Sequence, residues 1–276
     1  MPIQAKDVLK RMLYLPIMLY LSLAVYALFF SDQQIFLPQP SSYKDSPEIL
    51  KLRSANGSMI SALYLPSPAA KFTLLVSHGN AEDLGDDRDW LEGLRRAGFN
   101  VFAYDYQGYG TSQGKPSERG AYEDENAAYD YLTVNLRTPP DGIVILGRSV
   151  GSGPAVRLAA RRPVAGLILQ SAFVSAFRVL TRIPLIPFDK FPNYKEIGRV
   201  RCPVLIIHGT RDSVIPIWHG QRLFELANQP KQFVAVPGAD HNDLDMVAGA
   251  SYPKAIQSFA ATLEGKEVSP GPASGR

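Results

Sequence analysis

The stretch LGRSVGSG, residues 146–153, decides the fold. The apolar run 143–146 leads directly into it, and a helical pattern with its apolar residues on one face follows. Glycine has no Cβ, so a strand and a helix can pack closely beside the turn that joins them. G-x-S-x-G between a strand and a helix is typical of a nucleophile elbow, which lifts its serine, here Ser149, to the carboxyl edge of a sheet.

Short apolar runs repeat along the rest of the chain. Asn56-Gly57 is a hairpin signal between two strand patterns at 48–53 and 58–65. Six further strands are predicted at 72–76, 99–103, 143–146, 167–169, 204–207 and 233–236. Helical patterns separate most of these runs. A hairpin followed by repeating strand–helix units predicts an α/β fold, a mainly parallel eight-stranded sheet flanked by helices on both sides.

A serine hydroxyl becomes a useful nucleophile only beside a base, normally a histidine that a carboxylate holds. In this type of fold the three residues follow the chain order serine, acid, histidine. Of the four histidines, His241 directly follows the last predicted strand. Asp212 follows the penultimate strand and precedes a helix. The predicted catalytic residues are therefore Ser149, Asp212 and His241.

The other three histidines receive structural interpretations. His78 ends a strand that precedes Ser149 in the chain, so it suits a structural or oxyanion-loop role. His208 is expected to brace the turn that presents Asp212. His219 falls in a predicted helix, where a surface or packing role is expected.

Four other aspartates are less suited to the role of the acid. Asp240 adjoins His241, but adjacent side chains seldom point at one another. Asp243 and Asp245 are interpreted as solvated loop charges, and Asp105, which precedes the serine, as structural.

An oxyanion hole in such a site takes one N–H from the residue after the nucleophile and one from the loop after the third strand. These residues are Val150 and Asn80, with Ala81 as the alternative to Asn80. The start of the helix after the serine also supplies the positive end of a helix dipole.

The segment 171–200 joins the sixth and seventh predicted strands and is rich in apolar residues. One interpretation is core; the other is a small lid or the wall of an acyl pocket, with Phe173, Phe177 and Leu180 as pocket residues. A pocket of this kind favours a lipid-like or acyl ester substrate.

The N-terminal segment is more apolar than the rest of the chain. Met12–Phe30 has no charged residue and is nearly long enough to cross a bilayer as a helix. Lys6, Lys10 and Arg11 precede it, which predicts a cytoplasmic N-terminus and a catalytic domain on the non-cytoplasmic face. A cleaved signal peptide is the alternative, although the apolar run is long for one.

We predict four parts: an anchor at 1–30, a linker at 31–47, one α/β domain at 48–263 and a disordered tail at 264–276. The net charge of +3 is spread along the chain, which gives no support to nucleic-acid binding. Cys202 is the only cysteine, so neither an intramolecular disulfide nor a cysteine metal cluster can form. No metal or organic cofactor is implied.

With these residues assembled, the chain resembles the α/β-hydrolase superfamily over residues 48–263. The resemblance rests on the motifs SHGNAEDLG, YDYQGYGTSQG, GRSVGSGPA, CPVLIIHGTRDSVIP and PGADHNDL. It is similar to the membrane-anchored branch that includes animal protein depalmitoylases, and to the "serine aminopeptidase" profile. The resemblance implies ester or thioester hydrolysis by Ser149, Asp212 and His241 without a cofactor. The N-terminal cysteine cluster of the depalmitoylases is absent here, and the apolar span takes its place. That span would put the site outside the cytoplasm, away from cytoplasmic acyl-proteins, which argues against depalmitoylation.

The function predicted from the sequence is therefore a membrane-anchored serine hydrolase that acts on carboxylic esters or thioesters. Two alternatives stay open. One is a peptidase for short peptides that uses the same residues, although no acidic clamp for a free amine is recognisable. The other is a non-catalytic scaffold with the hydrolase fold, although such proteins usually lack a member of the triad, and all three are present here.

Overall fold

A single eight-stranded sheet forms the centre of the molecule in the computed structural model, which describes residues 5–265 and side chains from residue 14 onwards. The strand order is β1-β2-β4-β3-β5-β6-β7-β8. The strands are β1 (Ile49–Arg53), β2 (Met59–Leu65), β3 (Thr73–Ser77), β4 (Asn100–Tyr104), β5 (Ile143–Arg148), β6 (Gly166–Gln170), β7 (Val204–Gly209) and β8 (Lys231–Val236). Residues 266–276 of the predicted tail lie outside the described residues.

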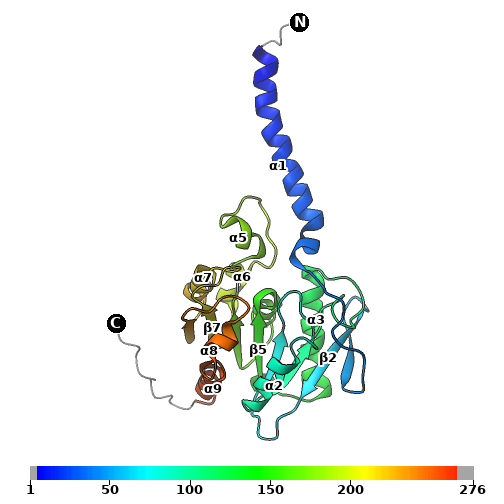
Figure 1. Cartoon of the computed structure of the whole chain (residues 1–276), viewed down its shortest axis with the longest axis vertical. Coiled ribbons are helices and arrows are strands. Elements are labelled where there is room, and N and C mark those ends of the chain that lie inside the picture. The colour runs from blue at the N-terminus through cyan, green and yellow to red at the C-terminus, as the bar shows by residue number, and fades with distance from the viewer. Residues whose placement is uncertain (1–4, 266–276) are drawn as a thin grey trace, which may run out of the picture.

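The sheet is parallel from β4 to β8, while β2 pairs antiparallel with both β1 and β4. The helices are α1 (Ala5–Ile35), α2 (Arg88–Arg96), α3 (Glu118–Asp130), α4 (Ser152–Ala159), α5 (Ala176–Thr181), α6 (Asn193–Glu196), α7 (Trp218–Leu226), α8 (Leu244–Ala248) and α9 (Ser251–Leu263). Short 3-10 helices occupy Pro140–Gly142, Ser149–Gly151 and Ile197–Arg199, and a π-helix continues α3 over Tyr131–Asn135. The predicted fold class is confirmed, with each predicted strand within a residue or two of its expected bounds (Figure 1).

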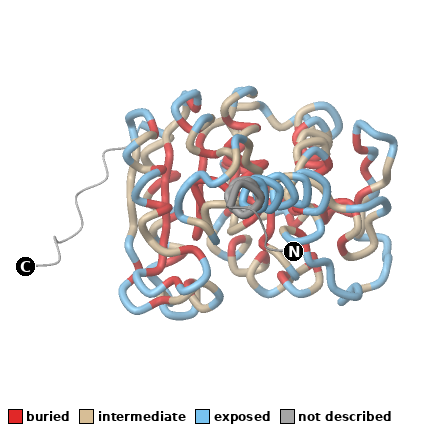
Figure 2. Tube along the Cα trace, turned by 90° about the horizontal axis from the view of Figure 1, so that it is seen from above, coloured by how far each residue is buried: buried red, intermediate tan, exposed pale blue. Residues whose placement is uncertain are grey.

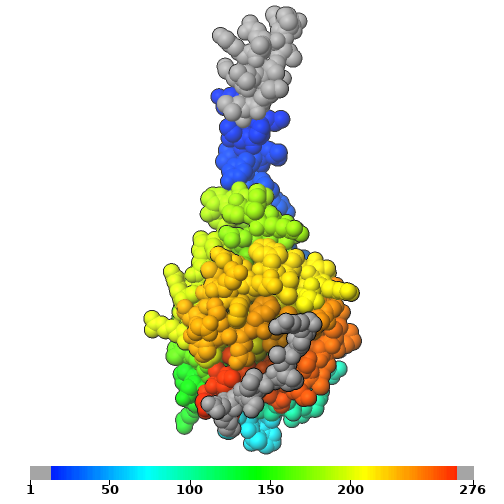
Figure 3. Space-filling view, turned by 90° about the vertical axis from the view of Figure 1, so that its left-hand side faces the viewer, coloured from blue at the N-terminus to red at the C-terminus, as the bar shows by residue number. Residues whose placement is uncertain are grey.

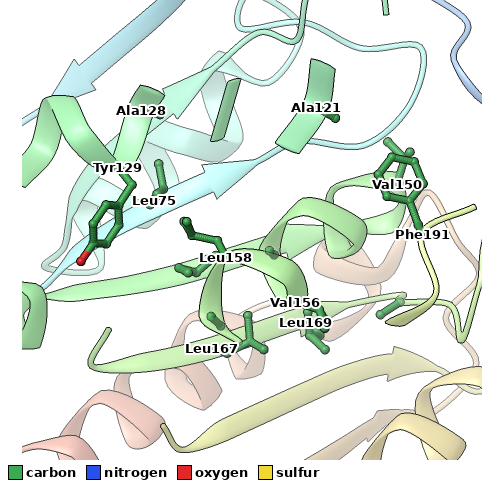
Figure 4. Close-up of a cluster of buried hydrophobic side chains, with 14 of the residues drawn as sticks. Leu75, Ala121, Ala128, Tyr129, Val150, Val156, Leu158, Leu167, Leu169 and Phe191 are labelled. Carbon is green, nitrogen blue, oxygen red and sulfur yellow. The ribbon is translucent and has the colours of Figure 1, made fainter. Parts of the chain in front are cut away.

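Two layers of helices cover the sheet because side chains alternate between the faces of each strand. On β3, Leu75 points into the cluster that α3 and α4 complete, whereas Leu74 and Val76 point into the cluster that α2 and α9 complete. Figure 4 shows the first cluster, in which Leu158 of α4 lies over the strands. The central strands are therefore buried on both faces, as their continuous apolar sequence predicts.

α1 projects from the body as a long exposed helix (Figure 1) and rises above the buried strands when seen from above (Figure 2). Its segment Tyr14–Ile35 is long and apolar enough to cross a membrane, by length and composition. α1 continues beyond the predicted anchor end at residue 30. Phe36, directly after it, is buried, with its ring centroid 5.9 Å from that of Phe191.

Candidate active site

The serine elbow follows from close packing at the end of β5. Ser149 has φ +52°, a left-handed conformation that is unfavourable for any residue with a Cβ and is held here by its surroundings. A Cβ on Gly147 would lie 2.6 Å from the Cβ of Ala155, and one on Gly151 would lie 2.0 Å from the Ser77 carbonyl oxygen. Glycine is therefore required at both positions for the strand, turn and helix to meet.

The three predicted catalytic side chains meet at the carboxyl edge of the sheet. The hydroxyl Oγ of Ser149 lies 2.9 Å from Nε2 of His241. Nδ1 of His241 lies 2.8 Å from Oδ2 and 3.0 Å from Oδ1 of Asp212. Each residue comes after a strand: Ser149 directly follows β5, Asp212 lies in the loop after β7, and His241 lies in the loop after β8. This arrangement can pass a proton from the hydroxyl to an imidazole that a carboxylate orients.

The carboxylate of Asp212 is kept ionised. Burial alone would raise its pKa, but hydrogen bonds with His208 and His241 hold that pKa well below its usual range. The N–H groups of Val214 and Ile215 also donate to Oδ1 of Asp212. A charged carboxylate at this place can orient the ring of His241 and stabilise the positive charge that develops on it during proton transfer.

Two of the other histidines, His208 and His219, have structural roles. Nε2 of His208 lies 2.7 Å from the Ile215 carbonyl oxygen and 3.4 Å from Asp212, so this ring braces the acid turn as expected. His219 is buried against Trp218, in a packing role, and burial lowers its pKa to about 4.

Asp240 does not approach the ring of His241. Its Oδ1 accepts hydrogen bonds from the backbone N–H groups of Ser213 and His241, each at 2.7 Å. Asp243 accepts from the Asp240 N–H, and Asp245 lies in α8. None of these three aspartates takes the place of Asp212.

Two backbone N–H groups suit an oxyanion. Val150 lies at the start of the 3-10 helix Ser149–Gly151, where N–H groups have no partner within the helix. The N–H of Ala81 donates to Oδ1 of Asn80 at 3.0 Å, and the N–H of Gly79 donates to Glu82 at 2.6 Å. The Asn80 N–H has no acceptor within residues 5–265. Asn80 stays the predicted second donor, since the N–H of Ala81 already has an acceptor.

A mostly apolar pocket of about 670 Å³ opens over Ser149 and His241. The three predicted pocket residues, Phe173, Phe177 and Leu180, all line it. Phe173 is also part of the core, so the two interpretations of segment 171–200 apply to different parts of it. A larger hollow of about 870 Å³ lies elsewhere, around Arg161 and Cys202, and contains none of the predicted site residues.

A charged network beside the pocket was not found by sequence reasoning. Arg148, the residue before the nucleophile, lies 3.5 Å from Glu82 and 3.3 Å from Asp87. His78, Glu82 and Asp87 have possible metal-ligating atoms within 4.8 Å of one another. The guanidinium of Arg148 already supplies positive charge to both carboxylates, so the group fits an ion-pair network better than a metal site. The pairing of Arg148 with Glu82 across the fold has no local sequence signal.

Comparisons with known proteins agree with the fold. Residues 73–195 match the family model described as the alpha/beta hydrolase fold. The chain is 43% identical over 210 residues to alpha/beta hydrolase domain-containing protein 17B of Homo sapiens, over 75% of this chain and 73% of that protein. It is 41% identical over 225 residues to the Xenopus laevis protein of the same name, over 80% of this chain and 77% of that protein.

Solved structures share the fold at lower identity. The Pyrococcus furiosus esterase Pf2001 superposes with a TM-score of 0.70 at 17% identity, over 82% of this chain and 98% of that one. The Paleococcus ferrophilus monoacylglycerol lipase gives a TM-score of 0.60 at 23% identity, over 74% of this chain and 99% of that one. The resemblance stated from the motifs is confirmed: the chain belongs to the α/β-hydrolase family and is a hydrolase related to the alpha/beta hydrolase domain-containing 17 proteins.

Proposed function

We propose that this protein is a membrane-anchored serine hydrolase that cleaves carboxylic esters or thioesters of acyl or lipid-like substrates. The observation that carries the proposal is the hydrogen-bonded series from Ser149 through His241 to Asp212 at the base of an apolar pocket. The esterase and lipase names of the structural neighbours agree with this reaction class.

In the proposed mechanism, Oγ of Ser149 attacks the acyl carbon while its proton moves to Nε2 of His241. The backbone N–H groups of Val150 and Asn80 stabilise the oxyanion of the tetrahedral intermediate. When the intermediate collapses, the alcohol or thiol leaves with the proton from His241, and the acyl group stays on Ser149. Water then attacks the acyl-enzyme, with His241 as base, and releases the carboxylic acid. Asp212 orients the imidazole throughout.

Anchoring through α1 and the division at residues 30, 47 and 263 belong to the same proposal. The orientation, with the catalytic domain on the non-cytoplasmic face, rests on Lys6, Lys10 and Arg11 before the span. Carbonate washing of membranes tests the anchor, because an integral protein stays in the pellet. Release of the full-length protein into the wash would contradict anchoring by α1.

A fluorophosphonate probe, which reacts with activated serines, tests the catalytic centre in the full-length protein. We expect labelling of the wild type, no labelling of Ser149→Ala, and normal labelling of Ser251→Ala, whose serine lies at the start of α9. Hydrolysis rates on p-nitrophenyl esters and on amino-acid anilides then separate the esterase from the peptidase. Faster cleavage of anilides, or labelling that persists in Ser149→Ala, would contradict the proposal.

A further inference from the structure

The pocket above Ser149 has walls from two segments that lie far apart in the chain. One wall is the segment that contains α5, with Phe177 and Leu180. The other wall is α1, which contributes Leu23, Tyr26 and Ala27. A helix that only anchored the protein would have no reason to line the pocket that contains the proposed nucleophile.

The end of α1 is hydrogen-bonded to Asn80, in the loop after β3. Nδ2 of Asn80 donates to the carbonyl oxygen of Ile35 at 2.7 Å, and Oδ1 of Asn80 accepts from the N–H of Leu37 at 2.9 Å. Lys190, which follows the α5 segment, lies 3.0 Å from Asp32 of α1. α1 is therefore joined to the loop that carries Asn80 and to Lys190 next to the α5 segment, and the domain holds its end near Ser149.

The α5 wall carries apolar side chains that line the pocket and are also exposed. Leu180 is 89% exposed, Ile183 59% and Leu185 49%. Figures 1 and 3 show this segment beside the lower part of α1, on the side of the body from which α1 projects. Because exposed apolar residues next to a membrane-spanning helix favour contact with lipid, the bilayer is the natural cover for both walls.

The pocket-lining part of α1 belongs to its apolar span. At about 1.5 Å per residue, Leu23 lies roughly 18 Å along the helix axis from Ile35. Both residues fall within the span Tyr14–Ile35. A pocket wall that includes Leu23 thus extends into the depth at which acyl chains of a bilayer lie.

Ala27 occupies the centre of this wall. Leu23 and Ser31, one helical turn before and after it, also line the pocket. Ala27 is half-buried in a helix whose other residues are mostly exposed. Its methyl group leaves space that a larger side chain would fill, whereas Val25 lies on the far side of the helix and does not line the pocket.

We infer that α1 is part of the substrate site: the acyl chain of a membrane-resident ester enters directly from the bilayer between α1 and the α5 segment, and Ala27 determines the chain length that the site accepts. This inference rests on the proposed ester hydrolysis. It assigns to α1 a role in specificity in addition to anchoring.

The experiment compares Ala27→Phe with the matched control Val25→Phe in the full-length protein, reconstituted in phosphatidylcholine vesicles. The rates are measured on p-nitrophenyl acetate, octanoate and hexadecanoate. We expect Ala27→Phe to lower kcat/KM on hexadecanoate by about tenfold or more, because a ring would fill the space of the chain. Acetate hydrolysis stays within about twofold of the wild type, which also shows that the variant is folded, and Val25→Phe changes neither rate.

Three results would overturn the inference alone: no change in Ala27→Phe, an equal loss on acetate and hexadecanoate, or the same selective loss in Val25→Phe. Absence of hydrolysis by the wild type on every ester would instead overturn the proposed function, and the inference with it. The two failures are therefore distinguishable in one set of assays.

Discussion

Two histidine–carboxylate pairs at the carboxyl edge of the sheet join residues that follow two neighbouring strands. His241 and Asp212 follow β8 and β7, and His78 and Asp105 follow β3 and β4. In the first pair, one ring nitrogen contacts the carboxylate and the other reaches the hydroxyl of Ser149. In the second, Nδ1 contacts the Gly79 carbonyl oxygen and Nε2 lies 3.4 Å from Asp105.

The two pairs differ in the group that the other ring nitrogen of the histidine contacts: a serine hydroxyl for His241 and a backbone carbonyl oxygen for His78. Burial alone would lower the pKa of His78, but Asp105 outweighs this effect and raises that pKa to about 9, so His78 is a buried cation near neutral pH. Its ring also packs 4.5 Å from that of Tyr106, centroid to centroid. A histidine beside an aspartate is therefore suited to catalysis only where its free nitrogen faces a nucleophile and a pocket. Otherwise the same pair supports a loop.

The largest expected effect on kcat comes from replacing the aspartate of the first pair, and the aspartate of the second pair serves as the comparison. Asp212→Asn should lower kcat by about 10⁴-fold, because the amide no longer stabilises the imidazolium or the correct tautomer of His241. Asp105→Asn should leave kcat within about tenfold of the wild type and lower the unfolding temperature instead, because it removes the partner of a buried cation. Steady-state kinetics and thermal unfolding check both variants. Equal losses of kcat would contradict the distinction.

A smaller effect is expected at Glu82, which links the His78 region to the candidate active site. Its Oε1 accepts from the Gly79 N–H at 2.6 Å and so positions the loop that carries Asn80. Glu82→Ala should lower kcat by roughly tenfold to a hundredfold with little change in KM, less than the direct loss of an oxyanion donor. Glu82→Gln, which keeps an acceptor oxygen, should recover most of the rate. A rise in KM with unchanged kcat would argue against this positioning role.

Asp240 directly precedes His241 in the sequence, so replacing it tests whether Asp212 is the acid of the first pair. Its carboxylate contacts backbone N–H groups and not the imidazole, and asparagine keeps an oxygen for those contacts. Asp240→Asn should therefore change kcat by less than about threefold, since the effect of exposed charges is small. Measured beside Asp212→Asn, a loss of similar size would show that the acid has been assigned to the wrong residue.

The smallest effect on activity is expected at Glu125, a buried carboxyl near the second pair, His78 and Asp105. It accepts from Ser77, the residue before His78, and burial raises its pKa from 4.5 to about 8. The native state therefore holds a proton that the unfolded chain releases above pH 4.5, so this group contributes stability that is lost as the pH rises toward 8.

Glu125→Gln is neutral at every pH and should weaken the fall in unfolding temperature between about pH 5 and 8. Glu123→Gln, on the same helix, serves as the control and should keep the slope of the wild type. An unchanged slope in Glu125→Gln would mean that the native carboxyl is already ionised in this range.

The sheet and the three site residues could be predicted from local sequence patterns. Each of the latter follows a short apolar run, and parallel strands bring their carboxyl ends to one edge whatever the loops between them. Their hydrogen-bond distances agree with the predicted roles, which stay predictions until activity is measured.

What the sequence did not predict depends on contacts between distant segments. The ion pairs of Arg148 with Glu82 and Asp87 join residues more than sixty positions apart in the chain, without a periodic signal. The segment 31–47, predicted as a linker, makes contacts with the domain through Phe36 and Leu37, and its polar composition gave no sign of them. Such contacts become visible only when the fold is known.

The hold of Asn80 on the last turn of α1 has a mechanical consequence. A bilayer accommodates a helix of mismatched length by making it tilt, and thicker and thinner membranes impose different tilts. Asn80 binds the end of α1 through its side-chain amide and also lines the pocket, so a change of tilt would displace atoms beside the scissile bond. Under the proposed anchoring by α1, turnover by this protein would vary with the thickness of the membrane, even when substrate concentration is constant.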